Sequence, residues 1–223
     1  MRYAAILSLA RGIAKKHDIS RNRRRLGEFM EDMFNAVARR FNLCERGFQA
    51  RAAIYGEAFQ AIFTVIMEEL FPDVRLIHGC EMEDACLMGV GKADFVVIDE
   101  EDRILAVIEA KGSADYIICN GRRIELHRPG LIRTDTTKKA IANAAQVKYG
   151  ISGDIPYIIV TSHKPYEGSS SHCMLKLVEG KLVDMVVDVK RYDELREMVK
   201  LIRGAKPSKL IYRRGRAVRI GTR

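Results

Sequence analysis

The chain has 223 residues, of which 48% are hydrophobic and 30% are charged, and its formal net charge is +9. This balance is typical of a globular protein and excludes a disordered chain, and the length suits one packed domain with additions. Charged residues interrupt every apolar run well before about 18 residues, which excludes a transmembrane helix.

Charge is distributed unevenly along the chain. Residues 1–51 and 111–223 carry net positive charge, whereas residues 52–110 carry net negative charge. Basic flanks around an acidic centre suit a polyanion-binding surface that surrounds a carboxylate-lined cation site. Basic proteins are also often basic for solubility alone, and charge by itself leaves both interpretations open.

The five cysteines are odd in number and form no Cys-x-x-Cys pair. This pattern predicts neither a disulfide framework nor a structural zinc site, and it favours a reducing cytoplasm as the location. The apolar run at the N-terminus is short and is interrupted by Arg11. We therefore expect an amphipathic helix there rather than a signal peptide.

Apolar residues at three- and four-residue intervals predict the first elements. They indicate amphipathic helices over residues 2–17 and 25–41. A third helix is expected over residues 52–71, where Pro72 ends it. We expect these helices to pack their apolar faces together.

The period then changes to that of strands. Three runs rich in Val and Ile predict strands over residues 74–82, 93–98 and 103–110. The polar segment 99–102 is a tight connection, so the second and third strands are expected to pair antiparallel.

A hairpin and a helix are expected next. Asn120-Gly121 lies at the centre of residues 115–127 and is a strong hairpin-turn signal. Thr134 or Asp135 can cap a helix that reaches to about Tyr149 and is ended by Gly150.

The last third of the chain predicts strands, a helix and a basic tail. Residues 155–162 form a buried strand, and residues 173–178 and 181–189 are expected to be strands around a Glu-Gly turn. A helix is expected from about residue 191 to 203. The tail that follows carries seven basic residues and no acidic residue.

Asp94, Glu109 and Lys111 carry the most informative pattern. Asp94 opens one expected strand, and Glu109 and Lys111 close the next. If the two strands pair through residues 99–102, the start of the first lies beside the end of the second. Alternation along a strand then places Glu109 and Lys111 on one face, close to Asp94.

Two carboxylates at one end of a strand pair repel each other unless a cation shields them. Mg²⁺ binds a few carboxylate oxygens together with waters, and it can acidify a bound water and stabilise charge on a phosphate. Lys111 could then orient the nucleophile or neutralise the transition state. The alternative is a pair of solvated strand-end carboxylates with Lys111 as their salt-bridge partner.

These residues resemble the PD-(D/E)XK nucleases, the superfamily that contains most restriction endonucleases. The resemblance makes Asp94 the first acidic residue, Glu109 the second and Lys111 the lysine, with Ala93 where the family has proline. It implies a fold of the α/β class, built on a mixed sheet of the α+β type. The core is expected to be restriction-endonuclease-like, in the order helix, three antiparallel strands, helix, strand. That order matches the elements expected over about half of the chain.

The expected organisation is a single nuclease domain over residues 1–223. It comprises a helical basic extension at 1–51, the catalytic core at 52–162, and C-terminal strands, helix and basic tail at 163–223.

Many family members add a glutamate from the helix that precedes the sheet. Glu57 suits this catalytic role by resemblance, and Glu28 is a weaker rival. The alternative for Glu57 is a first-turn glutamate that the helix dipole favours.

Basic and hydroxyl side chains after the catalytic strands are candidates for DNA binding. The hairpin residues Arg122, Arg123 and Arg128, with His127, could enter a groove and read bases. Donors at the start of the following helix suit a phosphate. The full candidate set is Arg122, Arg123, Arg128, Arg133, Thr134, Lys138, Lys139, Arg213, Arg214 and Arg216.

The sequence therefore predicts a metal-dependent endonuclease that hydrolyses double-stranded DNA, with Mg²⁺, or Mn²⁺ as a substitute, held by Asp94 and Glu109. A sequence-specific type II restriction endonuclease is the first choice. It would be a homodimer, because palindromic sites match two-fold symmetry, with a DNA methyltransferase encoded nearby. The alternatives are a repair, recombination or defence nuclease with little sequence specificity, and an inactive DNA-binding module. No membrane partner is expected.

Overall fold

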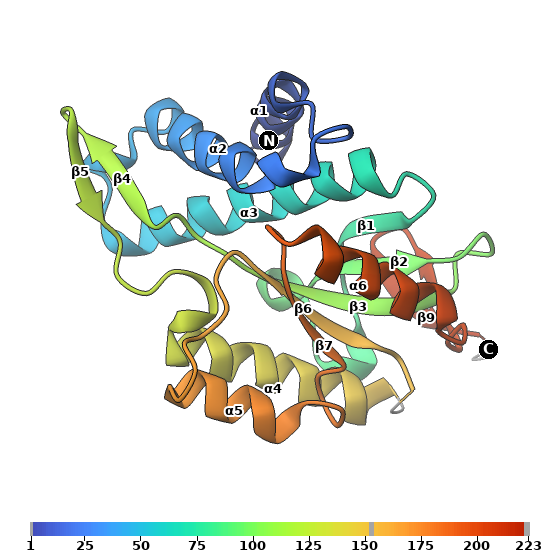
Figure 1. Ribbon diagram of the computed structural model, residues 1–223. Helices are drawn as coiled ribbons and strands as arrows, with labels where there is room; N and C mark the ends of the chain where they lie inside the picture. The colour runs from blue at the N-terminus through green and yellow to red at the C-terminus, as the bar shows by residue number, and fades with distance from the viewer. Residues whose placement is uncertain (1, 152–153, 221–223) are drawn as a thin grey trace.

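The computed structural model describes residues 2–151 and 154–220, in which helices flank a central sheet (Figure 1). The helices are α1 (Arg2–His17), α2 (Leu26–Arg40), α3 (Phe48–Leu70), α4 (Thr134–Ile151), α5 (Ser170–Val178) and α6 (Tyr192–Gly204). The strands of the central sheet are β1 (Arg75–Cys80), β2 (Ala93–Ile98), β3 (Ile104–Lys111), β6 (Tyr157–Thr161) and β7 (Met185–Asp188). Two hairpins lie outside it, β4 (Tyr116–Cys119) with β5 (Arg122–Glu125), and β8 (Leu210–Arg213) with β9 (Arg216–Arg219).

The five-stranded sheet is mixed, with the order β1-β2-β3-β6-β7. β1, β2 and β3 pair antiparallel, and β6 then joins β3 in parallel. A parallel neighbour needs a crossover connection, and α4 lies in the segment that joins these two strands. The core order is therefore helix, three antiparallel strands, helix and strand, which confirms the predicted fold class.

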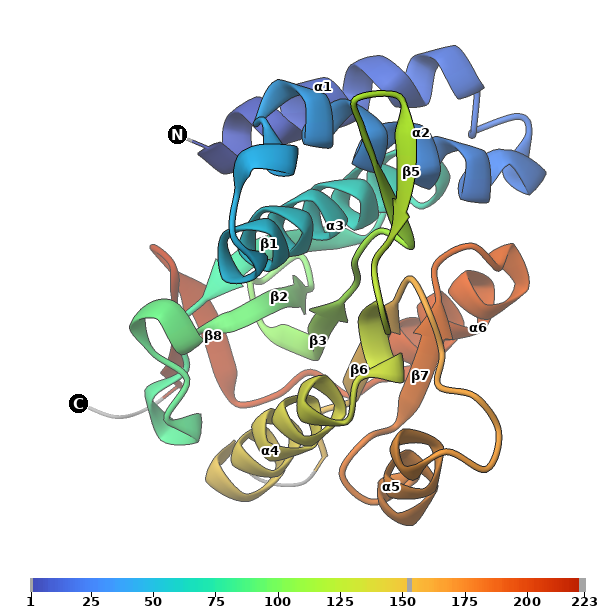
Figure 2. The ribbon, with the colours of Figure 1, turned by 90° about the vertical axis from the view of Figure 1, so that its left-hand side faces the viewer.

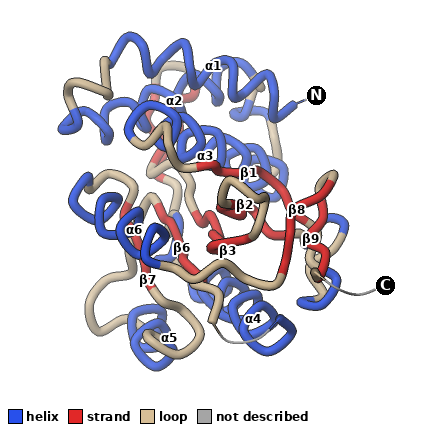
Figure 3. The backbone as a smooth tube through the Cα atoms, turned by 90° about the vertical axis from the view of Figure 1, so that its right-hand side faces the viewer, coloured by secondary structure: helices blue, strands red, loops and turns tan. Residues whose placement is uncertain are grey.

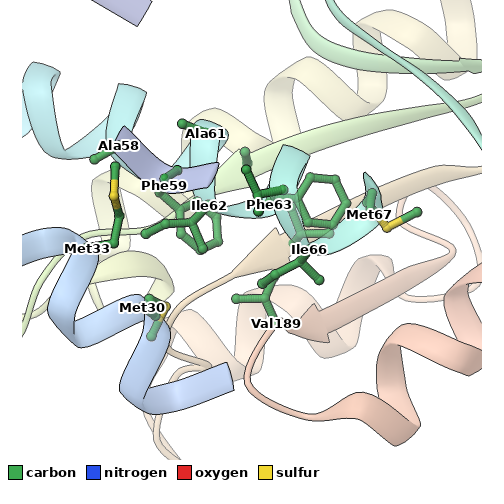
Figure 4. Close-up of a cluster of buried hydrophobic side chains, with 14 of the residues drawn as sticks. Met30, Met33, Ala58, Phe59, Ala61, Ile62, Phe63, Ile66, Met67 and Val189 are labelled. Carbon is green, nitrogen blue, oxygen red and sulfur yellow. The ribbon is translucent and has the colours of Figure 1, made fainter. Parts of the chain in front are cut away.

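Alternate residues of each strand point to two hydrophobic layers on opposite faces of the sheet. One layer contains α1, α2, α3 and α6, and the other contains α4 and α5 (Figure 2). α3 is apolar on nearly all sides because it lies between the N-terminal helices and the sheet. Its residues Phe59, Phe63 and Ile66 are fully buried in the layer drawn in Figure 4. Among the described residues, no helix is long and apolar enough to cross a membrane.

Both hairpins have the same kind of turn. The predicted Asn120-Gly121 turn has φ values of 51° and 73°, the left-handed conformation that Asn and Gly adopt most easily. Arg214-Gly215 has the same conformation, with φ values of 47° and 87°. The β8–β9 hairpin, which the sequence did not lead us to expect, lies beside β1 and the β2–β3 connection (Figure 3).

Two expectations for the second half of the chain are wrong. Residues 173–178 belong to helix α5 rather than to a strand, because the Ser169 hydroxyl caps the helix by accepting from the His172 amide at 3.2 Å. Helix α4 continues through Gly150 to Ile151. Gly150 is needed there for close packing, since a Cβ on it would lie 2.0 Å from the Asp84 carbonyl oxygen.

The expectation of unpaired cysteines is also wrong. Cys44 and Cys119 form a disulfide that ties the segment after α2 to the end of β4. Among the described residues, Cys80, Cys86 and Cys173 are free thiols. Unpaired cysteines therefore no longer support a cytoplasmic location.

Candidate active site

The sheet brings Asp94, Glu109 and Lys111 together as the sequence predicted. Phe95 pairs with Ile108, so Asp94 lies opposite Glu109 across the β2–β3 ladder. Lys111, two residues after Glu109, lies on the same face of β3. Its backbone carbonyl accepts a 2.6 Å hydrogen bond from the Thr161 hydroxyl, which fixes the end of β3 to β6.

The ammonium of Lys111 connects the two carboxylates. It makes a short ion pair with Glu109, and its Nζ lies 3.7 Å from Asp94 Oδ2. The Glu109 side chain is 3% exposed, whereas Asp94 and Lys111 are 18% and 20% exposed. Lys111 therefore acts as the counter-ion of the buried Glu109 carboxylate.

Burial and charge act in opposite directions on these groups. Burial raises the pKa of Glu109, and although Lys111 opposes this, the pKa stays above the usual value of a carboxyl group. Burial lowers the pKa of Lys111, but the charges of Glu109 and Asp94 outweigh this and raise it overall. Two neighbouring carboxylates that share a single ammonium group can bind a cation of higher charge, such as a divalent metal ion.

Gln60 on α3 orients Asp94. Its amide Nε2 donates to Asp94 Oδ1 at 2.7 Å, while the Ala110 amide donates to Asp94 Oδ2 at 2.8 Å. The Gln60 carbonyl oxygen accepts from His78 Nε2 at 2.9 Å, and the His78 ring stacks on Tyr3 at 3.8 Å. Burial lowers the pKa of His78, and Lys92 adds to this effect. When His78 Nε2 donates to the Gln60 oxygen, it holds the Gln60 amide with its nitrogen toward Asp94.

Glu109 is oriented from the opposite face of the sheet. Asn143 on α4 donates its side-chain Nδ2 to Glu109 Oε1 at 3.0 Å. The buried Tyr157 has a pKa well above the usual value because of burial and the nearby charge of Glu109. Our sequence analysis missed both Gln60 and Asn143. Their helices were predicted, but the rotation of each helix about its axis was not.

A pocket of about 490 Å³ opens next to these residues. Asp94, Lys111 and Gly112 line it together with residues of α3 and of the segment that follows β5. The pocket lining includes Phe48, Arg51, Tyr55 and Gln60 from α3, residues 124–130, and Arg133 and Thr136. Asp94 and Lys111 are therefore accessible from the pocket, whereas Glu109 is buried behind them.

The donor set suits Mg²⁺. In the described part of the chain, no group of three or more His, Cys, Asp or Glu side chains is placed to hold a metal. Mg²⁺ does not need such a cage, because it commonly binds one or two carboxylates and completes its shell with waters and phosphate oxygens. Asp94 and Glu109, which lie beside each other and share one ammonium, supply the two carboxylates that such a site requires.

Glu57, the predicted third carboxylate, does not join this group. It forms an ion pair with Arg2 of α1, with Arg2 Nε 2.6 Å from Glu57 Oε2. Gln60, one turn further along α3, contacts Asp94 instead. The rival Glu28, on α2, pairs with Arg25 at 2.8 Å.

The structure brings part of the predicted DNA-binding set to the pocket. Arg128 and Arg133 line it, and the Arg133 guanidinium lies 5.1 Å from the centre of the Phe48 ring. Thr134 begins α4 nearby, and Lys138 and Lys139 are exposed on the same helix.

The predicted base-reading hairpin is exposed and projects from the body of the protein (Figure 1). Arg122 and Arg123 lie on its outer strand. Arg123 stacks over Tyr116 at 3.7 Å and pairs with Glu125 at 2.6 Å, so it is the more restrained of the two.

The arginines of the tail lie elsewhere. Arg213 and Arg214 line a separate shallow pocket with Arg75 and Asp102. Arg216 pairs with Glu81 at 3.2 Å, so part of the basic tail is neutralised by the body of the protein.

Comparisons with known proteins add little to this geometry. No protein-family model matches the sequence, and no curated protein matches it at a significant level. Among solved structures, the complex of the restriction endonuclease PspGI with substrate DNA is similar. The match covers 92% of this chain and 83% of that chain, at 16% sequence identity and a TM-score of 0.49. The chemistry of this site is therefore argued from its own residues.

Proposed function

We propose that the protein is a Mg²⁺-dependent endonuclease that hydrolyses phosphodiester bonds of double-stranded DNA. The observation that carries this proposal is the pair of carboxylates, Asp94 and Glu109, that share the Lys111 ammonium, with Asp94 and Lys111 lining an open pocket. Guanidinium groups line the walls of the same pocket, which suits a polyanionic substrate.

The residues of the site have distinct roles in this proposal. Asp94 and Glu109 would hold the metal, oriented by Gln60 and Asn143 respectively. Bound Mg²⁺ would acidify a water and neutralise charge on the phosphate. Lys111, relieved of its carboxylate partners, would donate to the scissile phosphate or orient the attacking water.

The first test is the metal requirement. We expect cleavage of supercoiled plasmid with Mg²⁺ or Mn²⁺, none in excess chelator, and little with Ca²⁺. Calcium takes more ligands at longer distances than two oriented carboxylates provide. Full activity in excess chelator would contradict the metal mechanism.

The proposal extends to a sequence-specific restriction enzyme that acts as a homodimer beside a methyltransferase. Discrete fragments from the same plasmid would support this form. A smear would favour a repair, recombination or defence nuclease, and DNA binding without cleavage would favour an inactive module.

The roles of the two helix side chains can be separated by substitution. Gln60→Ala should lower the cleavage rate about 10- to 100-fold, the usual effect of losing a partner that orients a metal ligand. Glu57→Gln should leave the rate unchanged, because it removes only a partly exposed pair with Arg2. Single-turnover cleavage at saturating enzyme measures the rates of both variants. Loss of activity in Glu57→Gln with a wild-type rate in Gln60→Ala would restore Glu57 as the third carboxylate.

A further inference from the structure

Most charges around the pocket are neutralised within the protein. Lys111 is shared by Asp94 and Glu109, Arg133 pairs with Asp135 at 2.7 Å, and Glu125 pairs with Arg123. Arg51 and Arg128, two arginines of the pocket lining, differ from these neutralised groups in having no partner among the described residues. Within residues 2–151 and 154–220, neither has an ion-pair or hydrogen-bond partner.

Arg51 is held in a place that favours an external partner. It lies in the first turn of α3 and is half-buried, and its Nε–H is shielded from solvent and donates to no protein group in the described part of the chain. The buried hydroxyl of Tyr55, one turn further along α3, also has no partner. A shielded donor that is left unpaired costs free energy, so such groups commonly mark a missing ligand.

Arg128 lines the same pocket from a different segment of the chain. It lies in the segment after β5, with a φ of 58° that turns the chain before Pro129 and Gly130. Two unpaired guanidinium groups that line one pocket from two segments can bind one anion together, and planar guanidinium groups match phosphate oxygens in pairs.

We propose that Arg51 and Arg128 form a clamp for a DNA phosphate that flanks the bond to be cut. This inference rests on the proposed nuclease function and assigns Arg51 a role that the sequence did not indicate. The position of this phosphate, away from the bond to be cut, follows from the distance along α3 between Arg51 and Gln60, the α3 residue that contacts Asp94. Arg51 precedes Gln60 by nine residues, about 14 Å along the helix axis. That span corresponds to a few nucleotides, at about 3.4 Å of duplex axis for each phosphate of a strand.

The test compares Arg51→Gln, Arg128→Gln and the double variant with Arg46→Gln as a matched control. Arg46 precedes α3, donates to the Phe41 carbonyl at 2.7 Å, and lies outside the pocket lining. The affinity of a labelled 30-base-pair duplex is measured by fluorescence anisotropy in chelator over a salt series. Cleavage of the plasmid with Mg²⁺ gives KM and kcat.

Each clamp variant should weaken binding about tenfold, as expected for one lost charged hydrogen-bond donor. The slope of log affinity against log salt should fall by about 0.9 for each lost phosphate contact. KM should rise while kcat stays unchanged, since a flanking phosphate is held equally in the ground and transition states. Arg51→Lys should retain the salt slope but recover only part of the affinity.

Variants that behave like Arg46→Gln would overturn the clamp even though the wild-type protein cuts DNA. A fall in kcat without a change in KM would place Arg51 at the scissile phosphate and also overturn the flanking position. If the wild-type protein binds duplex but does not cut it, the nuclease proposal fails while the binding measurement still decides on the clamp. A wild-type protein that does not bind duplex would overturn both.

Discussion

Asp94→Asn is expected to lower the cleavage rate about a thousandfold or more. The amide is the same size as the carboxylate and can still accept from the Ala110 amide, but it is a poor ligand for Mg²⁺. Loss of a metal ligand removes several kcal/mol of transition-state stabilisation, and each 1.36 kcal/mol is about tenfold in rate. Glu109→Gln and Lys111→Met should be similarly inactive. Single-turnover plasmid cleavage measures the loss.

Folding and DNA binding provide the control for these variants. The thermal unfolding temperature should fall only modestly for Asp94→Asn. The amide oxygen can still accept from the Ala110 amide, while the new NH2 group requires the Gln60 amide to flip so that its oxygen accepts. Binding of duplex in chelator should be unchanged or stronger, since a negative charge that faces the phosphate is removed. Asp94→Ala is less suitable, because it leaves the buried Ala110 and Gln60 donors without a partner. A wild-type cleavage rate in Asp94→Asn would place the chemistry elsewhere.

Gly112→Ala is expected to destabilise the fold by about 3 kcal/mol. A Cβ on Gly112 would lie 2.1 Å from the ring of Phe59, which is fully buried and has no room to move. Overpacking of this kind costs about 1–3 kcal/mol or more. Because Gly112 follows Lys111 directly, displacement of the chain should also move Lys111 and lower the proposed nuclease activity. Urea unfolding measures the free energy.

Gly12→Ala is the matched control for this substitution. Gly12 lies on the exposed side of α1, and a Cβ there has no neighbour within 4 Å. Alanine in a helix interior is favoured over glycine by about 0.5–1 kcal/mol, so this variant should be slightly more stable than the wild-type protein. Equal unfolding midpoints for the two variants would contradict the close approach of Gly112 to Phe59.

The central strands could be predicted because several local signals agreed. Three signals indicated the same antiparallel pairing, which the structure has. They were the Val- and Ile-rich runs, the polar connection at residues 99–102 and the position of Asp94. Once the register is given, strand alternation places Glu109 and Lys111 on one face without further information. The catalytic group was therefore predictable from short-range sequence patterns.

The residues that orient the carboxylates could not be predicted in the same way. Gln60 and Glu57 are three residues apart on α3 and lie on neighbouring sides of that helix. Which of them faces Asp94 depends on how α3 packs between α1 and the sheet. Since α3 is apolar on almost all sides, its sequence has no clear polar face to indicate this rotation.

The errors in the C-terminal third have a different origin. Residues 173–178 are short and apolar, and at this length strand and helix patterns are difficult to distinguish. The serines that precede them, including the cap Ser169, were the signal for a helix. Arg214-Gly215 was likewise a turn signal for the β8–β9 hairpin.

The disulfide between Cys44 and Cys119 makes the central part of the chain a closed ring. The two cysteines are 75 residues apart, and the ring contains α3, β1, β2 and β3, with Asp94, Glu109 and Lys111. Closing a loop of this size removes conformations from the unfolded chain, which favours the folded state by roughly 4–5 kcal/mol on a chain-entropy estimate. Even after unfolding, the segment that builds the active site keeps its two ends together.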